Sequence, residues 1–151
     1  MIKILLIIVV LVFAALLALA LSSRTGRAPG LTDGRLAPCP AKPNCVNSEY
    51  PADEAHYVAP LALESVAPGQ AWQTLQKAIR DSGGEIVELT DNYLAARYRT
   101  ALLGFTDDVE ARLAADQGVI HLRSASRVGY GDMGVNRKRV ERIRRLYEAT
   151  P

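Results

Sequence analysis

The segment from Arg123 to Arg139 has the residue types of an anion-binding site. It reads RSASRVGYGDMGVNRKR and joins a predicted strand to a predicted C-terminal helix. Its glycines allow a close backbone approach, and the start of a helix offers free amide donors to an anion. Arginine side chains bind phosphate and carboxylate groups in a bidentate manner. We predict a site for a phosphate, a carboxylate or a lipid headgroup, formed by Arg123, Arg127, Gly129, Gly131, Asn136, Arg137 and Arg139.

The same residues also admit a structural interpretation. Positive charges at residues 137–139 fall in the first turn of the predicted helix, where they oppose the helix dipole by a few tenths to about 1 kcal/mol each. Internal carboxylates could offset them, and the candidates are Asp107, Asp108, Glu110, Asp132 and Glu141. An anion site requires unpaired arginines around a concave surface, whereas internal pairing requires a carboxylate for each arginine.

Catalysis has little support in the sequence. Ser124 and Ser126 lack the context of a nucleophile elbow, and His56 and His121 stand in no recognisable order with a serine or cysteine. Two cysteines and two histidines also make a poor zinc set. We predict a non-enzymatic binding or structural module with no catalytic residue, metal or cofactor. The alternative is a hydrolase acting at the same Gly/Arg-rich loop.

The charge distribution argues against a nucleic-acid partner. Residues 42–119 carry 6 Lys/Arg against 12 Asp/Glu, whereas residues 120–151 carry 8 against 3. A nucleic-acid-binding domain normally has a strongly basic face or an overall basic charge. We therefore expect no nucleic-acid partner, and the sequence leaves the oligomeric state open.

Cys39 and Cys45 lie in a proline-rich loop, separated by five residues. The prolines restrict the backbone around the two thiols. We predict a disulfide, with free thiols or metal ligation as alternatives. By chain entropy such a small ring is worth about 2 kcal/mol, so it would shape the loop more than it would stabilise the fold.

An unbroken apolar run of 18 residues, Ile4–Leu21, opens the chain. It is at the lower limit for a membrane-spanning helix and is longer than the roughly 7–15 apolar residues of a signal peptide. We predict a retained anchor over residues 1–21, with a signal peptide cleaved after Ala20 as the alternative. Flanking charges leave the orientation open, but disulfides form in oxidising compartments. We therefore predict a single-pass protein of the inner (plasma) membrane, with a periplasmic or otherwise extracytoplasmic C-terminal domain.

The rest of the chain predicts an α+β domain over residues 56–151, behind a Pro/Gly-rich linker and Cys loop over residues 22–55. Trp72, Leu75 and Ile79 recur at helical spacing after Pro68 and predict one helix with these side chains in the core. A second helix is predicted from Asn136, as its N-cap, to about Ala149. Four strands with alternating patterns are predicted between them. They are Glu85–Leu89, Tyr93–Thr100, Asp108–Ala114 and Val119–Ser126. The expected architecture has two layers, with one antiparallel sheet of four or five strands and both helices on one face.

Strand alternation divides the predicted sheet into an apolar face, toward the helices, and a polar face. The polar face would be either a charge ladder in water or the floor of a binding cleft. Its residues are Arg97, Arg99, Asp108, Glu110, Arg112, His121 and Arg123.

Three motifs resemble the domain of unknown function 1499 family of bacterial and plastid proteins. They are CPAKPNCVNS at 39–48, FTDDVE at 105–110, and RSASR with GVNRKR between 123 and 139. The resemblance covers roughly residues 38–146. Because the family has no established activity, substrate or cofactor, the resemblance implies no catalytic residue.

Overall fold

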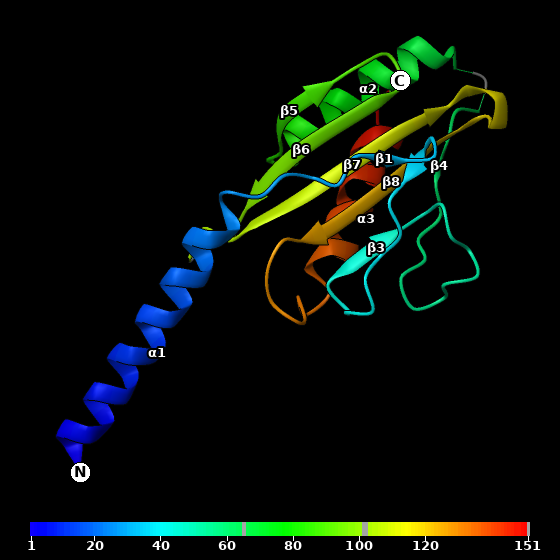
Figure 1. The fold of residues 1–151 in the computed structure, drawn as a ribbon. Coiled ribbons are helices and arrows are strands. Elements are labelled where there is room, and N and C mark those ends of the chain that lie inside the picture. Colours follow the sequence, from blue (N-terminus) through cyan, green and yellow to red (C-terminus); the bar gives the residue numbers. More distant parts are fainter. Residues whose placement is uncertain (65, 101–102, 151) are drawn as a thin grey trace.

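The computed structural model describes residues 1–64, 66–100 and 103–150, and Figure 1 shows a long N-terminal helix leading into a helix-and-sheet domain. The helices are α1 (Ile2–Ser23), α2 (Pro68–Asp81) and α3 (Val135–Glu148), with a 3-10 turn, η1, at Ala115–Gln117. The strands are β1 (Leu31–Thr32), β2 (Arg35–Leu36), β3 (Cys45–Asn47), β4 (Leu61–Ala62), β5 (Glu85–Leu89), β6 (Tyr93–Arg99), β7 (Thr106–Ala114) and β8 (Val119–Ser126).

The main sheet has six antiparallel strands in the order β3-β8-β7-β6-β5, and β4 also pairs with β8. The predicted α+β fold with an antiparallel sheet is therefore confirmed. The sheet exceeds the expected four or five strands because β3 and β4 add short segments to the outer edge of β8. β3 comes from the Cys loop, where prolines hid a three-residue strand from the sequence pattern.

Helices α2 and α3 pack on one face of the sheet (Figure 1). The side chains beneath them are apolar. Trp72, Leu75 and Ile79 of α2 are buried, as their helical spacing predicted. They join a single core with the inward side chains of β6, β7 and β8, which include Leu94, Ala96, Val109, Ala111, Ile120 and Leu122. The predicted apolar face is confirmed.

The opposite, polar face of the sheet is covered by residues 24–37, which we call the strap. Its hairpin of β1 and β2 places Leu36, which is fully buried, against Tyr93 and Ala95. The backbone N–H of Gly30 donates to the Glu110 carboxylate at 2.9 Å. This part of the predicted linker thus follows an ordered path across the sheet. It covers part of the polar face, while Arg112 and His121 line a pocket beside it and Arg99 stays exposed.

Helix α1 is long and apolar enough to cross a membrane, by length and composition. Nearly all of it is exposed, but Ala20 and Ser23 in its last turn are buried. The backbone N–H of Thr106, at the start of β7, donates to Ser23 Oγ at 3.0 Å. Helix α1 therefore runs into the folded domain with no free spacer between them.

Candidate functional site

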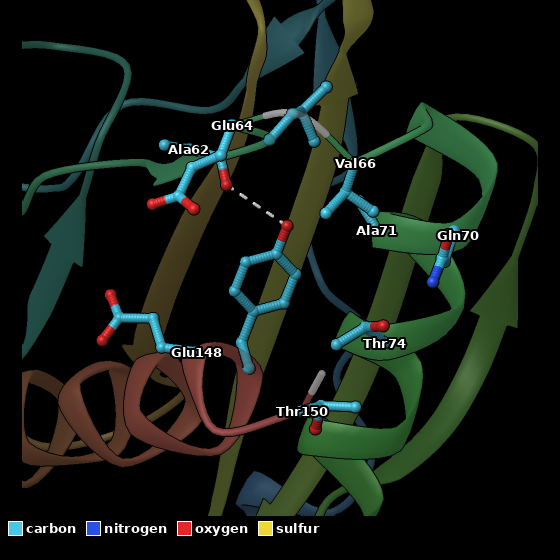
Figure 2. Close-up of a pocket in the computed structure, with 10 residues that line it drawn as sticks. Ala62, Glu64, Val66, Gln70, Ala71, Thr74, Glu148 and Thr150 are labelled. Atoms are coloured by element: carbon cyan, nitrogen blue, oxygen red, sulfur yellow. Dashed lines mark hydrogen bonds between the residues drawn. The ribbon is translucent and has the colours of Figure 1, made fainter.

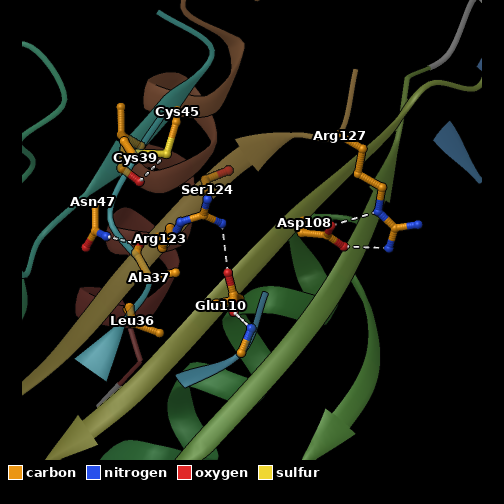
Figure 3. Close-up of polar contacts among 12 residues, drawn as sticks. Leu36, Ala37, Cys39, Cys45, Asn47, Asp108, Glu110, Arg123, Ser124 and Arg127 are labelled. Carbon is orange, nitrogen blue, oxygen red and sulfur yellow. Dashed lines mark hydrogen bonds and ion pairs between the residues drawn. A yellow bond between two sulfur atoms is a disulfide. The ribbon is translucent and has the colours of Figure 1, made fainter. Parts of the chain in front are cut away.

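Two arginine–carboxylate pairs lie side by side between the sheet and the strap (Figure 3). Arg127 donates through Nε and Nη2 to the two oxygens of Asp108, both at 2.7 Å, and Arg123 Nη1 donates to Glu110 at 2.8 Å. The register of β7 and β8 places Glu110 directly opposite Arg123. All four side chains are at most 9% exposed. Arg123 and Arg127 lie on one face of the sheet, but each meets its own carboxylate.

Glu110 is fully buried and receives hydrogen bonds from three parts of the chain. Besides Arg123, the Tyr93 hydroxyl donates at 2.8 Å and the strap N–H of Gly30 at 2.9 Å. Burial raises the pKa of Glu110 overall. The Arg123 charge and the hydrogen bonds favour the ionised form and act in the opposite direction, but they do not outweigh burial. This carboxylate joins β6, β8 and the strap.

Glu49 forms a third buried centre under the strap. Arg112 Nε donates to it at 2.6 Å and Arg35 Nε, from β2, at 2.7 Å. Burial raises the pKa of Glu49, but hydrogen bonds from Arg112, Arg35 and the Leu36 N–H outweigh burial, so the pKa is lowered overall. The strap is thus fixed to the domain by carboxylates at Asp108, Glu110 and Glu49.

The arginines of α3 are also used within the fold. Arg139 Nη2 donates to Asp107 at 2.6 Å, and the guanidinium lies over the Tyr98 ring at 4.8 Å. Arg137 Nη1 donates to the carbonyl oxygen of Tyr57 at 2.9 Å. Asp107 and Asp108 point to opposite faces, as strand neighbours must. Asp107 therefore binds Arg139 on the helix side of the sheet, and Asp108 binds Arg127 on the strap side.

The predicted N-cap at Asn136 is wrong. Helix α3 begins at Val135 after Gly134, whose φ is 76°, and Asn136 is fully buried inside the first turn. Its side chain accepts from Ser124 Oγ at 2.6 Å and donates to the Asn44 carbonyl at 3.0 Å. Asn136 therefore connects the helix to β8 and the Cys loop instead of capping the helix.

The start of α3 already holds an anion of the chain itself. The Asp132 carboxylate accepts from the backbone N–H groups of Gly134 at 2.9 Å and Asn136 at 2.8 Å. Burial raises the pKa of Asp132, but these hydrogen bonds outweigh it and lower the pKa overall. The sequence named Asp132 as a partner for the arginines, but it accepts from the backbone amides of the helix start and from Asn136 instead.

The glycines of the loop serve the turn itself. Gly129 has a φ of 90°, in the left-handed region that favours glycine, and its carbonyl oxygen accepts from Asn44 Nδ2 at 3.1 Å. Gly131 has no such φ and lies near Pro43 of the Cys loop. The structure thus gathers the predicted site residues at one end of β8. Arg123, Arg127 and Arg139 each meet a carboxylate, as the structural interpretation requires, whereas Arg137 donates only to backbone carbonyls.

The predicted disulfide between Cys39 and Cys45 is confirmed. It lies beside Asn47, whose Nδ2 donates to the Ala37 carbonyl at 2.8 Å (Figure 3). The Cys loop is held on β8 by β3, and it reaches the Gly/Arg-rich loop through Asn44. Two of the quoted motifs therefore form one polar network.

A serine–histidine pair was missed by the sequence reasoning. Ser48 Oγ lies 3.1 Å from His121 Nδ1, and His121 Nε2 lies 3.2 Å from Gln117 Oε1. Because an amide oxygen only accepts, Nε2 carries the proton and Ser48 donates to Nδ1. Burial lowers the pKa of His121 and favours the neutral ring. The pair comes from β8 and the end of β3, which are distant in sequence, so spacing alone gave no signal.

A small cavity of about 160 Å³ lies between α2 and the C-terminal end of α3 (Figure 2). Glu64, Gln70, Thr74 and Glu148 line it, and Tyr147 donates across it to the Ala62 carbonyl at 3.3 Å. Its described lining offers no nucleophile with an adjacent base. We assign no chemistry to this cavity.

The fold and its buried pairs define a small α+β domain that follows an apolar helix and is crossed by a fixed strap. The chain matches the family model described as "Protein of unknown function (DUF1499)" over residues 35–146. It belongs to this family. No curated protein matches the chain.

Proposed function

We propose that the protein is a single-pass membrane protein whose exported domain acts as a non-enzymatic structural or binding module held directly at the membrane surface. The observation that carries the proposal is the attachment of the end of helix α1 to the sheet. Arg127 Nη1 donates to the Ser23 carbonyl at 3.1 Å while the same guanidinium binds Asp108. One buried ion pair thereby joins the end of helix α1 to the sheet.

The dimensions of α1 support a retained anchor. Its 22 residues, at 1.5 Å per residue, span about 33 Å, and the hydrocarbon core of a bilayer is about 30 Å thick. Cleavage after Ala20 would cut inside the last turn, where Ala20 and Ser23 pack on the domain. The disulfide supports an oxidising compartment and therefore the outer face of the plasma membrane.

Two measurements test this proposal. The intact mass of the native protein is expected to include residues 1–21, and protease added to spheroplasts is expected to digest the domain. A chain starting near Leu21 would overturn the anchor. A protease-resistant domain that becomes sensitive only after lysis would overturn the export.

Anion binding near the Gly/Arg-rich loop is the finer part of the proposal. A pocket of about 320 Å³ beside Arg137, His56 and Tyr130 supports it, since Tyr130 is 72% exposed and offers an open wall. The Asp132 carboxylate in the same pocket opposes it. Calorimetric titration of the full chain with inorganic phosphate tests this part, and binding that Arg137→Gln removes is the supporting result.

A hydrolase is the second candidate, now favoured at a different place from the Gly/Arg-rich loop. Ser48, His121 and Gln117 line a pocket of about 620 Å³ in the order nucleophile, base and orienting group. The same contacts also serve packing, since the Leu122 N–H donates to Ser48 Oγ at 2.8 Å. Covalent labelling by a fluorophosphonate, absent in Ser48→Ala, would support the enzyme. An unlabelled wild-type protein would exclude this serine as an activated nucleophile.

A further inference from the structure

A further pocket lies where helix α1 meets the domain. It has a volume of about 440 Å³ and opens between the start of the strap, the edge strand β5 and its neighbour β6. Four of its lining residues are arginines, and its carboxylate is Glu88. The arginines are Arg24, Arg27, Arg97 and Arg127. The pocket is therefore a concentration of positive charge at the end of a helix that is apolar enough to cross a membrane.

The four arginines differ in whether they already form an ion pair with a carboxylate of the chain. Arg127 is committed to Asp108, and Arg97 donates through Nη2 to Glu85 at 3.0 Å. Arg24 and Arg27 are exposed and form no ion pair within the described part of the chain. Two guanidinium groups thus have capacity for an external anion.

Arg97 adds an independent sign that an acceptor belongs here. Its Nε is buried and has no hydrogen-bond partner among the described residues. A buried donor without a partner carries a desolvation cost, so Glu85 does not satisfy the Arg97 guanidinium fully, and the exposed part of this side chain, 30% of it, can turn toward an anion in the pocket. The Gly26 backbone lies against Arg127, where an added Cβ would come within 3.3 Å of Cδ. The strap therefore approaches the arginine cluster closely.

The remaining wall of the pocket is apolar. Val87, Ala28 and Ala95 line it, and Val87 is 46% exposed. A ligand with both a phosphate and an apolar part matches this combination. The location agrees, because Arg24 follows the last apolar residue of the run, Leu21, by three residues or about 5 Å of helix. The headgroup layer on each side of a bilayer is of similar thickness.

We propose that this pocket binds the phosphate of an anionic phospholipid headgroup, with Arg24 and Arg27 as the principal ligands and Arg97 as a further donor. This rests on the proposed membrane anchor. Guanidinium groups bind phosphate oxygens in a fork, which an ammonium group does not reproduce. A soluble phosphate ester shares this chemistry, so the experiment must separate the two sources.

The test uses the full chain in detergent micelles doped with either phosphatidylglycerol or phosphatidylcholine, and native mass spectrometry counts the retained lipids. We expect the wild type to retain phosphatidylglycerol about tenfold better, and R24Q/R27Q to lose this preference. R80Q/R142Q removes the same charge from exposed positions on α2 and α3, on the other face of the sheet, and is expected to behave as the wild type.

Two further arms complete the test. R24K/R27K keeps the charge but not the fork, so a defined site predicts a weakened preference, whereas an unchanged preference would indicate a diffuse field and overturn the site. Displacement of the lipid by soluble glycerol phosphate at matched concentration would reassign the pocket to a soluble ester. Equal retention of both lipids by the wild type would overturn the proposal. The mass and protease measurements above decide the anchor and its topology separately.

Discussion

Replacing Arg127 by alanine separates internal pairing from anion binding at this arginine. Its guanidinium makes two hydrogen bonds of 2.7 Å to Asp108, and the two side chains are 9% and 5% exposed. The substitution leaves a buried carboxylate without its counter-charge. Breaking one side of a buried ion pair costs about 3–5 kcal/mol. The bond to the Ser23 carbonyl is lost as well.

For a domain of this size, about 4 °C in the melting temperature corresponds to each kcal/mol, so we expect a fall of roughly 10–20 °C. Fluorescence of Trp72, the chain's one tryptophan, reports unfolding because the side chain is 6% exposed in the core. The full chain in detergent is the sample. D108A/R127A is the matched control, and it should be more stable than R127A because no charge is stranded.

A melting temperature of Arg127→Ala within about 2 °C of the wild type would refute the structural role of the pair. If that variant also lost a measurable affinity of the wild type for inorganic phosphate, Arg127 would belong to an anion site. A large loss of stability with no phosphate affinity in the wild type would leave Arg127 as a structural residue only.

Three further predictions concern other parts of the domain. Alkylation of the denatured, unreduced protein should leave Cys39 and Cys45 unmodified, and reduction should cost about 2 kcal/mol in denaturant unfolding. Free, labelled thiols would contradict the bridge. Since burial lowers the pKa of His121, the unfolded chain binds a proton that the folded chain does not as the pH falls below about 6.5. Stability should therefore decline there in the wild type but less in His121→Gln, and equal declines would contradict the assignment. Asp132→Ala should cost about 1 kcal/mol at neutral pH, because the capping carboxylate of α3 is lost. The lowered pKa of Asp132 makes that contribution disappear below about pH 4, so the two proteins should converge in acid.

The sequence predicted the elements whose signals are local. Trp72, Leu75 and Ile79 recur at helical spacing, and the structure buries all three. Val109 and Ala111 alternate with the polar residues Asp108, Glu110 and Arg112 and lie in the core as expected. These patterns succeed because each residue's burial is set by its own helix or strand. The Cys39–Cys45 bridge was accessible for the same reason, since its two ends are six positions apart.

The strap across the polar face could not be predicted from local sequence patterns. Gly30 bonds to Glu110 across 80 positions, and Arg127 bonds to the Ser23 carbonyl across 104. Nothing in the composition of residues 22–55 distinguishes a strap that binds a sheet from a flexible linker, because both are rich in glycine and proline. The N-cap prediction at Asn136 failed for a related reason. The side chain has the right chemistry for a cap, but it is used for long-range bonds that no local rule contains.

The positive charges at the start of α3 show how the fold meets a locally unfavourable arrangement. The Arg139 side chain extends away from the start of the helix and contacts Asp107 and the Tyr98 ring. The backbone amides at the helix start donate to the Asp132 carboxylate. The acidic groups thus come from the preceding turn and from β7. Arg137 donates instead to the Tyr57 carbonyl, and Lys138 forms no ion pair with any residue that the structure describes. Arg139 contrasts with the arginines at the start of the strap, because Arg24 and Arg27 form no ion pair within the described residues. Because these two lie beside the end of α1 and line a pocket there, their charge is placed where a membrane would supply anions.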